Sequence, residues 1–287
     1  MLTFYAPAKI NLTLEVLAKR QDGFHEIRSV IQTIDVGDIL HFQLSQNIEF
    51  KSDGPVWVPE ASLVSKAVKL VQKTTRCSNG VVVEVKKRTP LLSGLGGDSS
   101  DAAATLRGLN ELWGLGLSPM ALLGLASQLG SDVGFFLYGG TALVSGRGEV
   151  VTPLPPLPHR WVVLVVPSVG RTPGKTGRLY HSLKASNYTD GQITEKLVRQ
   201  LKMSKEFTLA PFNTFENLAF ARSSELKVWR EHIAKLGVDS VHLAGSGPTL
   251  FTLFRDKSQA EELYLRCQQQ GMETYLTETL AAIDQPD

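Results

Sequence analysis

The sequence contains little cysteine and no long hydrophobic run. Cys77 and Cys267 are its two cysteines, and neither belongs to a C-x-x-C pair. A disulfide framework or a cysteine-based metal site is therefore not expected, and reduced thiols in a cytosolic protein are favoured. A run of about 18 apolar residues, which a membrane span would need, does not occur. Lys9 and Asn11 interrupt the N-terminal segment before the apolar core of a signal peptide can form. We expect a cytoplasmic protein without a membrane partner.

The chain also lacks a strong excess of charge of either sign. Its 30 Lys and Arg residues and 28 Asp and Glu residues give a formal net charge of +2 at pH 7. Nucleic acids and acidic membranes are usually bound by clustered basic faces, and the densest basic run, residues 86–88, is short. We interpret this run as a solvated strand end and expect no nucleic-acid partner.

Apolar sequence is plentiful enough for a sizeable core. The 287 residues are 43% hydrophobic and 20% charged, which is typical of a globular protein. This length allows two domains, at roughly 100–200 residues each. The clearest break is the proline-rich stretch 153–158, because proline fixes φ and lacks an amide hydrogen. We place the boundary there, with one domain at residues 1–155 and the other at residues 156–287.

Helix and strand patterns are mixed along both halves. Period-two alternation and β-branched residues predict strands, whereas an apolar stripe at helical spacing predicts a helix. The expected strands are residues 8–16, 27–34, 39–44, 80–85, 161–166, 240–243 and 249–254, with a turn at residues 35–38. The expected helices are residues 61–71, 99–113, 193–201, 216–236 and 258–270. This mixture predicts an α+β fold.

A glycine-rich loop joins an expected strand to an expected helix. It consists of Pro90, Leu91, Leu92, Ser93, Gly94, Leu95, Gly96, Gly97, Asp98, Ser99 and Ser100. Glycine adopts positive φ without steric cost and lets a backbone approach a ligand closely. The first amide hydrogens of the following helix lack intrahelical partners, and the helix dipole is positive there. A capped turn is the simpler interpretation, but the combination predicts a site for nucleotide phosphates.

Four segments resemble one kinase superfamily, in the expected order along the chain. GLGGDSSDAA at residues 94–103 is similar to the ATP loop of the superfamily named for galactokinase, homoserine kinase, mevalonate kinase and phosphomevalonate kinase. Three further motifs resemble the branch of that superfamily that phosphorylates 4-diphosphocytidyl-2-C-methyl-D-erythritol in the non-mevalonate isoprenoid pathway. They are PAKINL at residues 7–12, DGFHE at residues 22–26 and LAGSGPT at residues 243–249.

The resemblance implies a two-domain α+β kinase with its active site in the cleft between the domains. Residues 1–155 would bind ATP and carry the catalytic groups, and residues 156–287 would bind the substrate. The implied reaction moves a phosphoryl group from ATP to the 2-hydroxyl of the cytidyl diphosphate sugar alcohol, giving the 2-phosphate and ADP. Mg²⁺ is the implied metal ion; its ligands are left open, with the hydroxyls of Ser99 and Ser100 as candidates for phosphate or magnesium. A monomer and a weak homodimer are both compatible with the sequence.

The sequence departs from the family pattern at three positions. Asp98 stands where a third glycine is usual, and its carboxylate would repel phosphate unless it points outward or helps to hold Mg²⁺. Phe24 replaces the usual tyrosine, and Gly134 stands where proline is common. None of these changes removes a group that the chemistry requires.

Asp132 is the expected base. It is the one acid in GSDVGFF at residues 130–136, which resembles the G-A-D-V-P-F segment of the family. An aspartate in such a place would by itself indicate a helix cap or a turn. The resemblance implies instead that it accepts the proton of the substrate hydroxyl, and burial among apolar neighbours would keep its proton affinity in a useful range.

Lys9 is expected to assist Asp132. It stands between Ala8 and Ile10 in an alternating strand pattern, where it is either an exposed strand lysine or a buried ammonium that needs a partner. The resemblance places Lys9 beside the aspartate and the reacting hydroxyl, where it would keep Asp132 ionised and offset charge on the transferring group. Asn11 faces the same side of the strand, so we expect it to hydrogen-bond the substrate or Asp132.

Four residues are candidates for substrate recognition. Phe24 offers a plane on which cytosine can stack, and His25 can hydrogen-bond the edge of the base. A histidine in a turn is by itself more often a solvated loop residue, so its inclusion depends on the resemblance. Thr176 and Asn213 are expected to line the substrate cleft on the same ground.

A second glycine loop lies between two expected strands in the C-terminal half. It is formed by Gly245, Ser246 and Gly247. A hairpin turn would explain it, whereas the resemblance implies a loop packed close to the phosphate site.

Another motif competes for the role of phosphate loop. GRTPGKT at residues 170–176 follows an expected strand and ends in Gly-Lys-Thr, as P-loop nucleotide triphosphatases do. The P-loop needs four residues between its glycines and this segment has three. Its proline also removes an amide hydrogen from a loop that works through amide hydrogens. This alternative would make Lys175, and not Lys9, the essential lysine.

Two further alternatives keep the fold and change the function. A nucleotide-responsive scaffold protein would share the fold, because fold alone does not determine function, but it would not need both Lys9 and Asp132. A kinase for another alcohol, such as mevalonate or homoserine, would share the chemistry. The DGFHE segment at residues 22–26 favours the cytidyl substrate.

Overall fold

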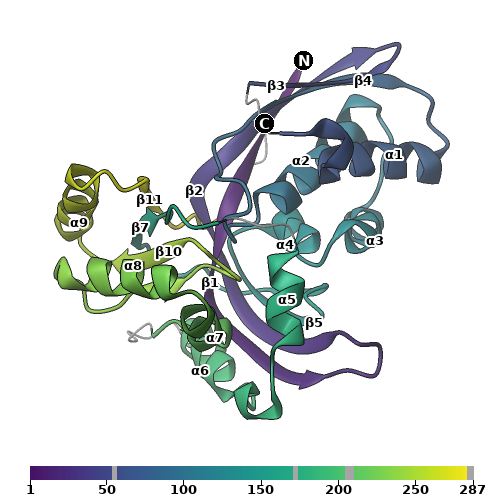
Figure 1. Cartoon of the computed structure of the whole chain (residues 1–287). Coiled ribbons are helices and arrows are strands. Elements are labelled where there is room, and N and C mark those ends of the chain that lie inside the picture. Colours follow the sequence, from purple (N-terminus) through teal and green to yellow (C-terminus); the bar gives the residue numbers. More distant parts are fainter. Residues whose placement is uncertain (54–56, 171–173, 204–209, 283–287) are drawn as a thin grey trace.

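Two β-sheets form the framework of the computed structural model, which describes residues 1–53, 57–170, 174–203 and 210–282 (Figure 1). The large sheet contains β1 (Leu2–Lys19), β2 (His25–Ser45), β3 (Ile48–Ser52), β4 (Gly80–Lys86), β5 (Thr141–Gly146), β6 (Val150–Pro153) and β8 (Phe212–Asn213). The small sheet contains β7 (Trp161–Val165), β9 (His242–Leu243), β10 (Leu250–Phe254) and β11 (Thr274–Glu278). In the large sheet the strand order is β3-β4-β2-β1-β8, and β5 pairs with both β2 and β6. In the small sheet the strand order is β11-β7-β10-β9.

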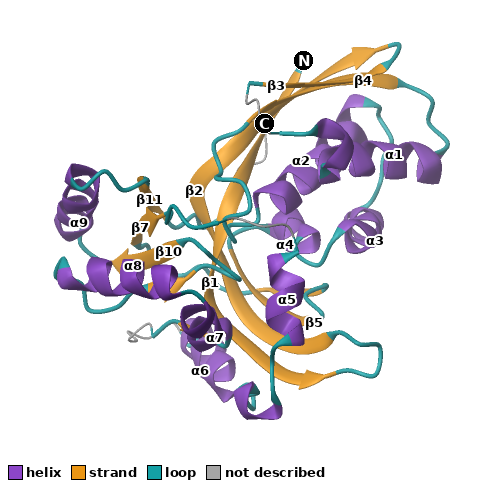
Figure 2. Cartoon of the chain, viewed as in Figure 1, coloured by secondary structure: helices purple, strands orange, loops and turns teal. Residues whose placement is uncertain are grey.

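The helices cover the two sheets in separate groups (Figure 2). Beside the large sheet lie α1 (Leu63–Thr75), α2 (Gly97–Leu112), α3 (Pro119–Leu129) and α4 (Val133–Tyr138). The C-terminal half contributes α5 (Lys175–His181), α6 (Gln192–Lys202), α7 (Phe215–Arg222), α8 (Ser224–Lys235) and α9 (Lys257–Gln269). Two 3₁₀ turns lie at Pro59–Ala61 and Ala185–Asn187. The mixture confirms the α+β class. Within the described ranges, no helix combines the length and the apolar character needed to cross a bilayer.

One long hairpin of β1 and β2 runs through the middle of the molecule and carries both groups of helices (Figure 1). The turn expected at residues 35–38 is wrong, because β2 continues through it. The register shifts there, since Pro7 pairs with Gly37 whereas Ala8 pairs with Ile34. The two unpaired residues form a bulge, and this allows a polar, turn-like stretch inside a continuous strand.

The single helix expected at residues 216–236 is also wrong, because Ser223 divides it into α7 and α8. Ser223 has extended backbone angles, and its hydroxyl accepts a hydrogen bond from the Leu226 amide at 3.1 Å. A serine side chain that caps a new helix in this way competes with continuation of the old one.

The C-terminal half also adds a strand to the large sheet. β8 pairs in parallel with β1, with Phe212 opposite Thr13 and Asn213 opposite Leu14. The Thr214 amide continues this contact by donating to the Leu14 carbonyl at 2.9 Å. Residues about 200 positions apart are therefore held next to each other, and the C-terminal half contributes the strand at the β1 edge of the large sheet.

A buried lysine connects the strand before the glycine-rich loop to the helix after it. Lys87 Nζ donates to Asp38 at 2.5 Å and to Asp101 at 2.7 Å, and both carboxylates are fully buried. Asp38 also accepts from the amides of Arg88 and Thr89, at 2.6 and 2.8 Å. Burial lowers the pKa of Lys87, but the negative charges of Asp101 and Asp38 outweigh this effect and raise the pKa above its usual value. Interpreting this basic run as a solvated strand end is wrong for Lys87, because its ammonium joins β4, β2 and α2.

Replacing Lys87 by methionine is expected to destabilise the protein. The Lys87→Met variant leaves two buried carboxylates facing each other without a cation, and breaking a buried ion pair in this way costs about 3–5 kcal/mol. Urea unfolding followed by circular dichroism measures the change. Lys69→Met, at an exposed position of α1, is the matched control and should shift stability by less than about 0.5 kcal/mol. Equal stability of the two variants would contradict the role of Lys87.

Candidate active site

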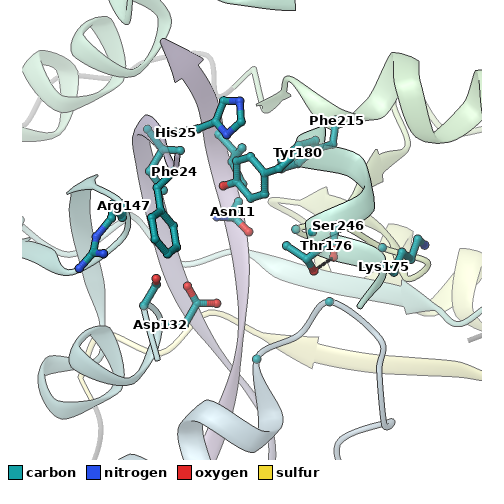
Figure 3. Close-up of a pocket in the computed structure, with 18 of the residues that line it drawn as sticks. Asn11, Phe24, His25, Asp132, Arg147, Lys175, Thr176, Tyr180, Phe215 and Ser246 are labelled. Carbon is teal, nitrogen blue, oxygen red and sulfur yellow. Dashed lines mark hydrogen bonds between the residues drawn. The ribbon is translucent and has the colours of Figure 1, made fainter. Parts of the chain in front are cut away.

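A cleft of about 800 Å³ opens between the central hairpin, the glycine-rich loop and the C-terminal half. Lys9 and Asn11 from β1 line this cleft, and Asp132 comes from the segment before α4. Figure 3 shows Asn11 and Asp132 among the side chains around it. Thr176 of α5 and Ser246 of the second glycine loop line the opposite wall. The structure therefore brings together residues that are more than 200 positions apart in the sequence.

The ammonium of Lys9 is buried beside Asp132. Lys9 Nζ lies 3.7 Å from Asp132 Oδ2, and the lysine side chain is only 6% exposed. It also donates to Asn11 Oδ1 at 2.8 Å, and the Asn11 amide donates to Ser29 Oγ at 2.9 Å. These contacts give a buried cation the oxygen partners that it needs. They also fix the Asn11 side chain, because its oxygen and its nitrogen are both engaged.

Asp132 is available for a ligand. It precedes the first residue of α4, yet its side chain makes no capping hydrogen bond. With 38% of its side chain exposed, Asp132 lies beside Lys9 and lines the cleft (Figure 3). The helix-cap interpretation of this aspartate does not describe the geometry. A carboxylate that is both charge-paired and open to the cleft can accept a proton from a bound hydroxyl.

The glycine-rich loop adjoins this pair directly. The Lys9 amide donates to the Leu95 carbonyl at 2.9 Å, which ties the loop to β1. Gly96 has a φ of +77° and precedes the first turn of α2. A side chain at Gly96 would meet the Phe136 ring and the Lys9 stem, so only glycine fits between them. The amino end of α2 consequently points toward the space beside Lys9, as a phosphate site requires.

The second glycine loop packs against the first. A side chain at Gly94 would collide with the Ala244 carbonyl oxygen, and the Thr249 amide donates to the Ser93 carbonyl at 3.2 Å. A Cβ at Gly245 would lie 3.2 Å from Lys9 Nζ. Two backbone loops from opposite halves of the chain therefore meet at the buried ammonium, with little room for side chains between them.

Asp98 points away from the cleft. Its carboxylate accepts a hydrogen bond from the Leu63 amide at 3.2 Å, at the start of α1. An acid at that position interacts favourably with the positive end of the helix. The change from glycine to aspartate thus leaves the space for phosphate free of an extra negative charge.

Aromatic side chains gather at the other end of the cleft (Figure 3). His25 stacks on Tyr180, with ring centroids 5.1 Å apart, and Tyr180 meets Phe215 edge-on at 4.9 Å. Phe24 lines the same end and is 54% exposed, and the Arg147 guanidinium lies 4.7 Å from the centre of its ring. This end of the cleft offers planar surfaces for an aromatic ligand.

Burial and charge modify the titration of two groups at this end. Burial, together with the nearby Lys19 and His181, lowers the pKa of His25 and favours its neutral form. Burial and the negative charge of Asp132 raise the pKa of Tyr180. Both shifts favour the uncharged form of the ring near neutral pH.

Tyr180 was missed by sequence reasoning, and so were Arg147 and Lys175 as residues that line the cleft. The signal for Tyr180 was its spacing, because it follows Thr176 by four residues and shares its face of α5. No comparable spacing distinguishes Arg147.

The predicted site residues Thr176 and Asn213 differ in their surroundings. Thr176 Oγ1 lies 2.8 Å from Ser246 Oγ in the cleft wall. Asn213 is 6% exposed and donates to the carbonyls of Leu243 and Gly245, at 2.9 and 2.8 Å. Asn213 therefore stabilises the second glycine loop through its backbone carbonyls.

The competing P-loop motif lies partly outside the described residues, at positions 171–173. Its last two residues, Lys175 and Thr176, form the start of the short helix α5. Lys175 lines the cleft, and burial together with Arg178 lowers its pKa.

Two family models match this chain. The model for the GHMP kinases N terminal domain matches residues 62–140, and the model for the GHMP kinases C terminal matches residues 195–272. The first contains the glycine-rich loop and Asp132, and the second contains Asn213 and the second glycine loop.

Relatives match over almost the full chain. A 4-diphosphocytidyl-2-C-methyl-D-erythritol kinase of Dehalococcoides mccartyi is 47% identical over 99% of this chain and 100% of its own length. A kinase with the same name from Geobacillus is 39% identical over 90% of each chain.

Solved structures give the same result. The crystal structure of a 4-(cytidine 5'-diphospho)-2C-methyl-D-erythritol kinase matches with a TM-score of 0.81 and 30% identity, over 97% of this chain and 99% of that chain. Homoserine kinase from Cytophaga hutchinsonii shares the fold, with a TM-score of 0.72 at 18% identity over 99% of this chain and 95% of that chain. The chain belongs to the 4-diphosphocytidyl-2-C-methyl-D-erythritol kinase family of the GHMP kinases.

Proposed function

We propose that the chain transfers the γ-phosphoryl group of ATP to the 2-hydroxyl of 4-diphosphocytidyl-2-C-methyl-D-erythritol, with Asp132 as the base and Lys9 as its partner. Membership of the family supports an ATP-dependent kinase that acts on this substrate. The observation that carries the assignment of residues is the buried Lys9–Asp132 pair, at 3.7 Å, directly beside both glycine loops.

Asp132 and Lys9 divide the catalytic work. The Asp132 carboxylate receives the proton of the substrate hydroxyl, whose oxygen then attacks the γ-phosphorus in line. The Lys9 ammonium lies beside Asp132 and offsets the negative charge that spreads over the transferring group. Because Lys9 is tied to Asn11 and to the loop at Leu95, its position needs little rearrangement during the reaction.

The phosphates of ATP are assigned to the glycine-rich loop, residues 90–100. Close packing of Gly94 and Gly96 against neighbouring groups leaves backbone, and not side chains, facing that space. The first-turn amides of α2 add to the anion site. The P-loop alternative is less well supported, because its two glycines are separated by three residues where a P-loop needs four.

The residues present fit a Mg²⁺ ion that shares its ligands with the phosphates. Such an ion binds through one or two protein groups and supplies neutralisation of phosphate charge. In the described part of the chain, no group of three or more His, Cys, Asp or Glu side chains could hold a metal alone. Ser100 Oγ is buried there without a hydrogen-bond partner. We assign Ser100 and Ser99 as the candidates that would hold the ion.

The aromatic end of the cleft is assigned to the cytosine base. Phe24 and Tyr180 present their rings to the cleft, and His25 is held by its stack on Tyr180. Stacking of a base on an aromatic ring contributes roughly 1–3 kcal/mol.

The proposal includes a cytoplasmic location and an ATP-binding unit that ends near residue 155.

Asp132→Asn is expected to lower kcat by about 10²-fold or more, because general base catalysis typically contributes 10²–10⁴-fold. ATP binding, measured by calorimetry with a non-hydrolysable analogue, should persist. Asp239→Asn, at an exposed aspartate outside the cleft, is the control and should leave kcat unchanged. Normal turnover of Asp132→Asn would remove this residue from the mechanism.

The substrate assignment predicts strong discrimination between alcohols. ADP release is measured with 4-diphosphocytidyl-2-C-methyl-D-erythritol, mevalonate and homoserine under the same conditions. We expect turnover with the cytidyl compound alone, because only that compound fills the aromatic end of the cleft. Efficient turnover of mevalonate would identify a different alcohol, whereas ATP binding without any product would indicate a scaffold protein.

Removal of divalent cations is expected to abolish turnover. EDTA should stop product formation, since the phosphate charge is then no longer neutralised, and excess Mg²⁺ should restore it. EDTA saturated with Mg²⁺ beforehand is the control for effects of the chelator. Full activity in EDTA would contradict the assignment of Mg²⁺.

A further inference from the structure

Arg147 covers one face of Phe24. Its guanidinium carbon lies 4.7 Å from the centre of the phenylalanine ring, which is within the range of a cation–π contact. In Figure 3, Arg147 lies on the side of Phe24 away from Tyr180. The ring face that turns toward Tyr180 is therefore left for the cleft.

The two residues come from neighbouring turns of the large sheet. Phe24 belongs to the turn between β1 and β2, and Arg147 belongs to the turn between β5 and β6. The Gly146 amide donates to Glu26 Oε1 at 3.1 Å, which links the two turns beside the ring. The β5–β6 turn can therefore act as a fixed support for the side chain of the β1–β2 turn.

The β5–β6 turn is itself held in place. The Arg147 amide donates to Glu149 at 2.6 Å, and the guanidinium Nε lies 3.7 Å from the same carboxylate. A Cβ at Gly148 would lie 2.8 Å from the Ser131 Cβ, so the turn packs tightly against the residue before Asp132. Arg147 is thereby fixed relative to the catalytic segment.

Phe24 needs such a support more than a buried ring does. Phe24 is 54% exposed, and it lacks a hydroxyl that could anchor the ring through a hydrogen bond. Its backbone is fixed, because the Phe24 amide donates to Asp22 Oδ1 at 3.1 Å. The ring itself can still rotate between rotamers, and an exposed ring that must be ordered when a base binds loses affinity.

We propose that Arg147 is a positioning residue that holds the Phe24 ring as a preformed stacking wall for the nucleobase of the substrate. The proposal builds on the cytidyl substrate assigned above. Arg147 acts through Phe24 and makes no contact of its own with the substrate. Its contribution should appear in the affinity for the cytidyl compound, and not in the chemical step or in the affinity for ATP.

A double-mutant cycle between Arg147 and Phe24 tests this role. Arg147→Gln removes the cation and should raise KM for the cytidyl substrate about threefold to fivefold, as expected for an exposed cation–π contact. The values of kcat and of KM for ATP should not change. In a Phe24→Leu background, which already binds the substrate more weakly, Arg147→Gln should have no further effect on KM.

Arg230→Gln is the matched control. Arg230 makes the same kind of contact with Phe220, at 4.8 Å, on the surface of α7 and α8 outside the cleft. Its loss should leave every kinetic constant unchanged. CDP binding measured by calorimetry provides a readout that does not depend on turnover, and it should weaken in Arg147→Gln to the same extent as KM rises.

Three results would overturn the proposal. An unchanged KM and unchanged CDP affinity in Arg147→Gln would show that the ring needs no support. An equal loss in the wild-type and Phe24→Leu backgrounds would show that Arg147 contacts the substrate directly. A fall in kcat without weaker binding would place Arg147 in the chemical step. If the wild type binds CDP but does not turn over the substrate, the proposed function fails and calorimetry still decides the role of Arg147.

Discussion

Burial of the Lys9 ammonium is the constraint around which this molecule is organised. A charge with only 6% of its side chain exposed is stable only if oxygen atoms surround it. Asn11 and Asp132 supply those oxygens, and the need to bring Asp132 there fixes where α4 begins. The two glycine loops can approach the same point because they carry no side chains that would displace the lysine. The stability of the fold and the chemistry of the site therefore depend on the same few contacts.

A second buried lysine works at the outer edge of the phosphate loop. Lys87 joins β4, β2 and α2 through Asp38 and Asp101, so the strand that leads into the loop and the helix that leaves it are held at a fixed separation. Lys9 faces the cleft, whereas Lys87 supports the backbone on both sides of the glycine-rich loop. A loop made largely of glycine would otherwise be costly to order.

Motifs predicted the centre of the site better than its periphery. Lys9, Asp132 and the glycine loops were singled out because the contiguous motifs that carry them resemble those of a kinase family, and the structure brings these residues together. Arg147 was missed because its position depends on how two distant turns meet in space, whereas Tyr180 was missed although its spacing from Thr176 on α5 offered a signal. The basic run at residues 86–88 was misjudged for a similar reason, since a buried lysine and an exposed one look alike until their partners are known.

The same limit applies to the fold. Alternation and helical spacing predicted the strands at residues 8–16 and 80–85 and the helix at residues 99–113. The strand at 80–85 shows the expected alternation of burial, whereas residues 8–16 are buried on both faces, which alternation in the sequence did not predict. The bulge in β2 and the break between α7 and α8 at Ser223 are local irregularities that a polar stretch or one serine hydroxyl can produce. The spacing of apolar residues along the sequence does not predict them.

The two-residue strand β8 has a consequence for how the chain can be divided. It lies in the C-terminal half, yet it completes an edge of the large sheet beside β1. A fragment that ended before residue 212 would leave that edge of β1 uncovered and open to association with other chains. If the two halves were expressed separately, the N-terminal half would expose an unpaired strand edge that favours aggregation. The two halves therefore form one folding unit.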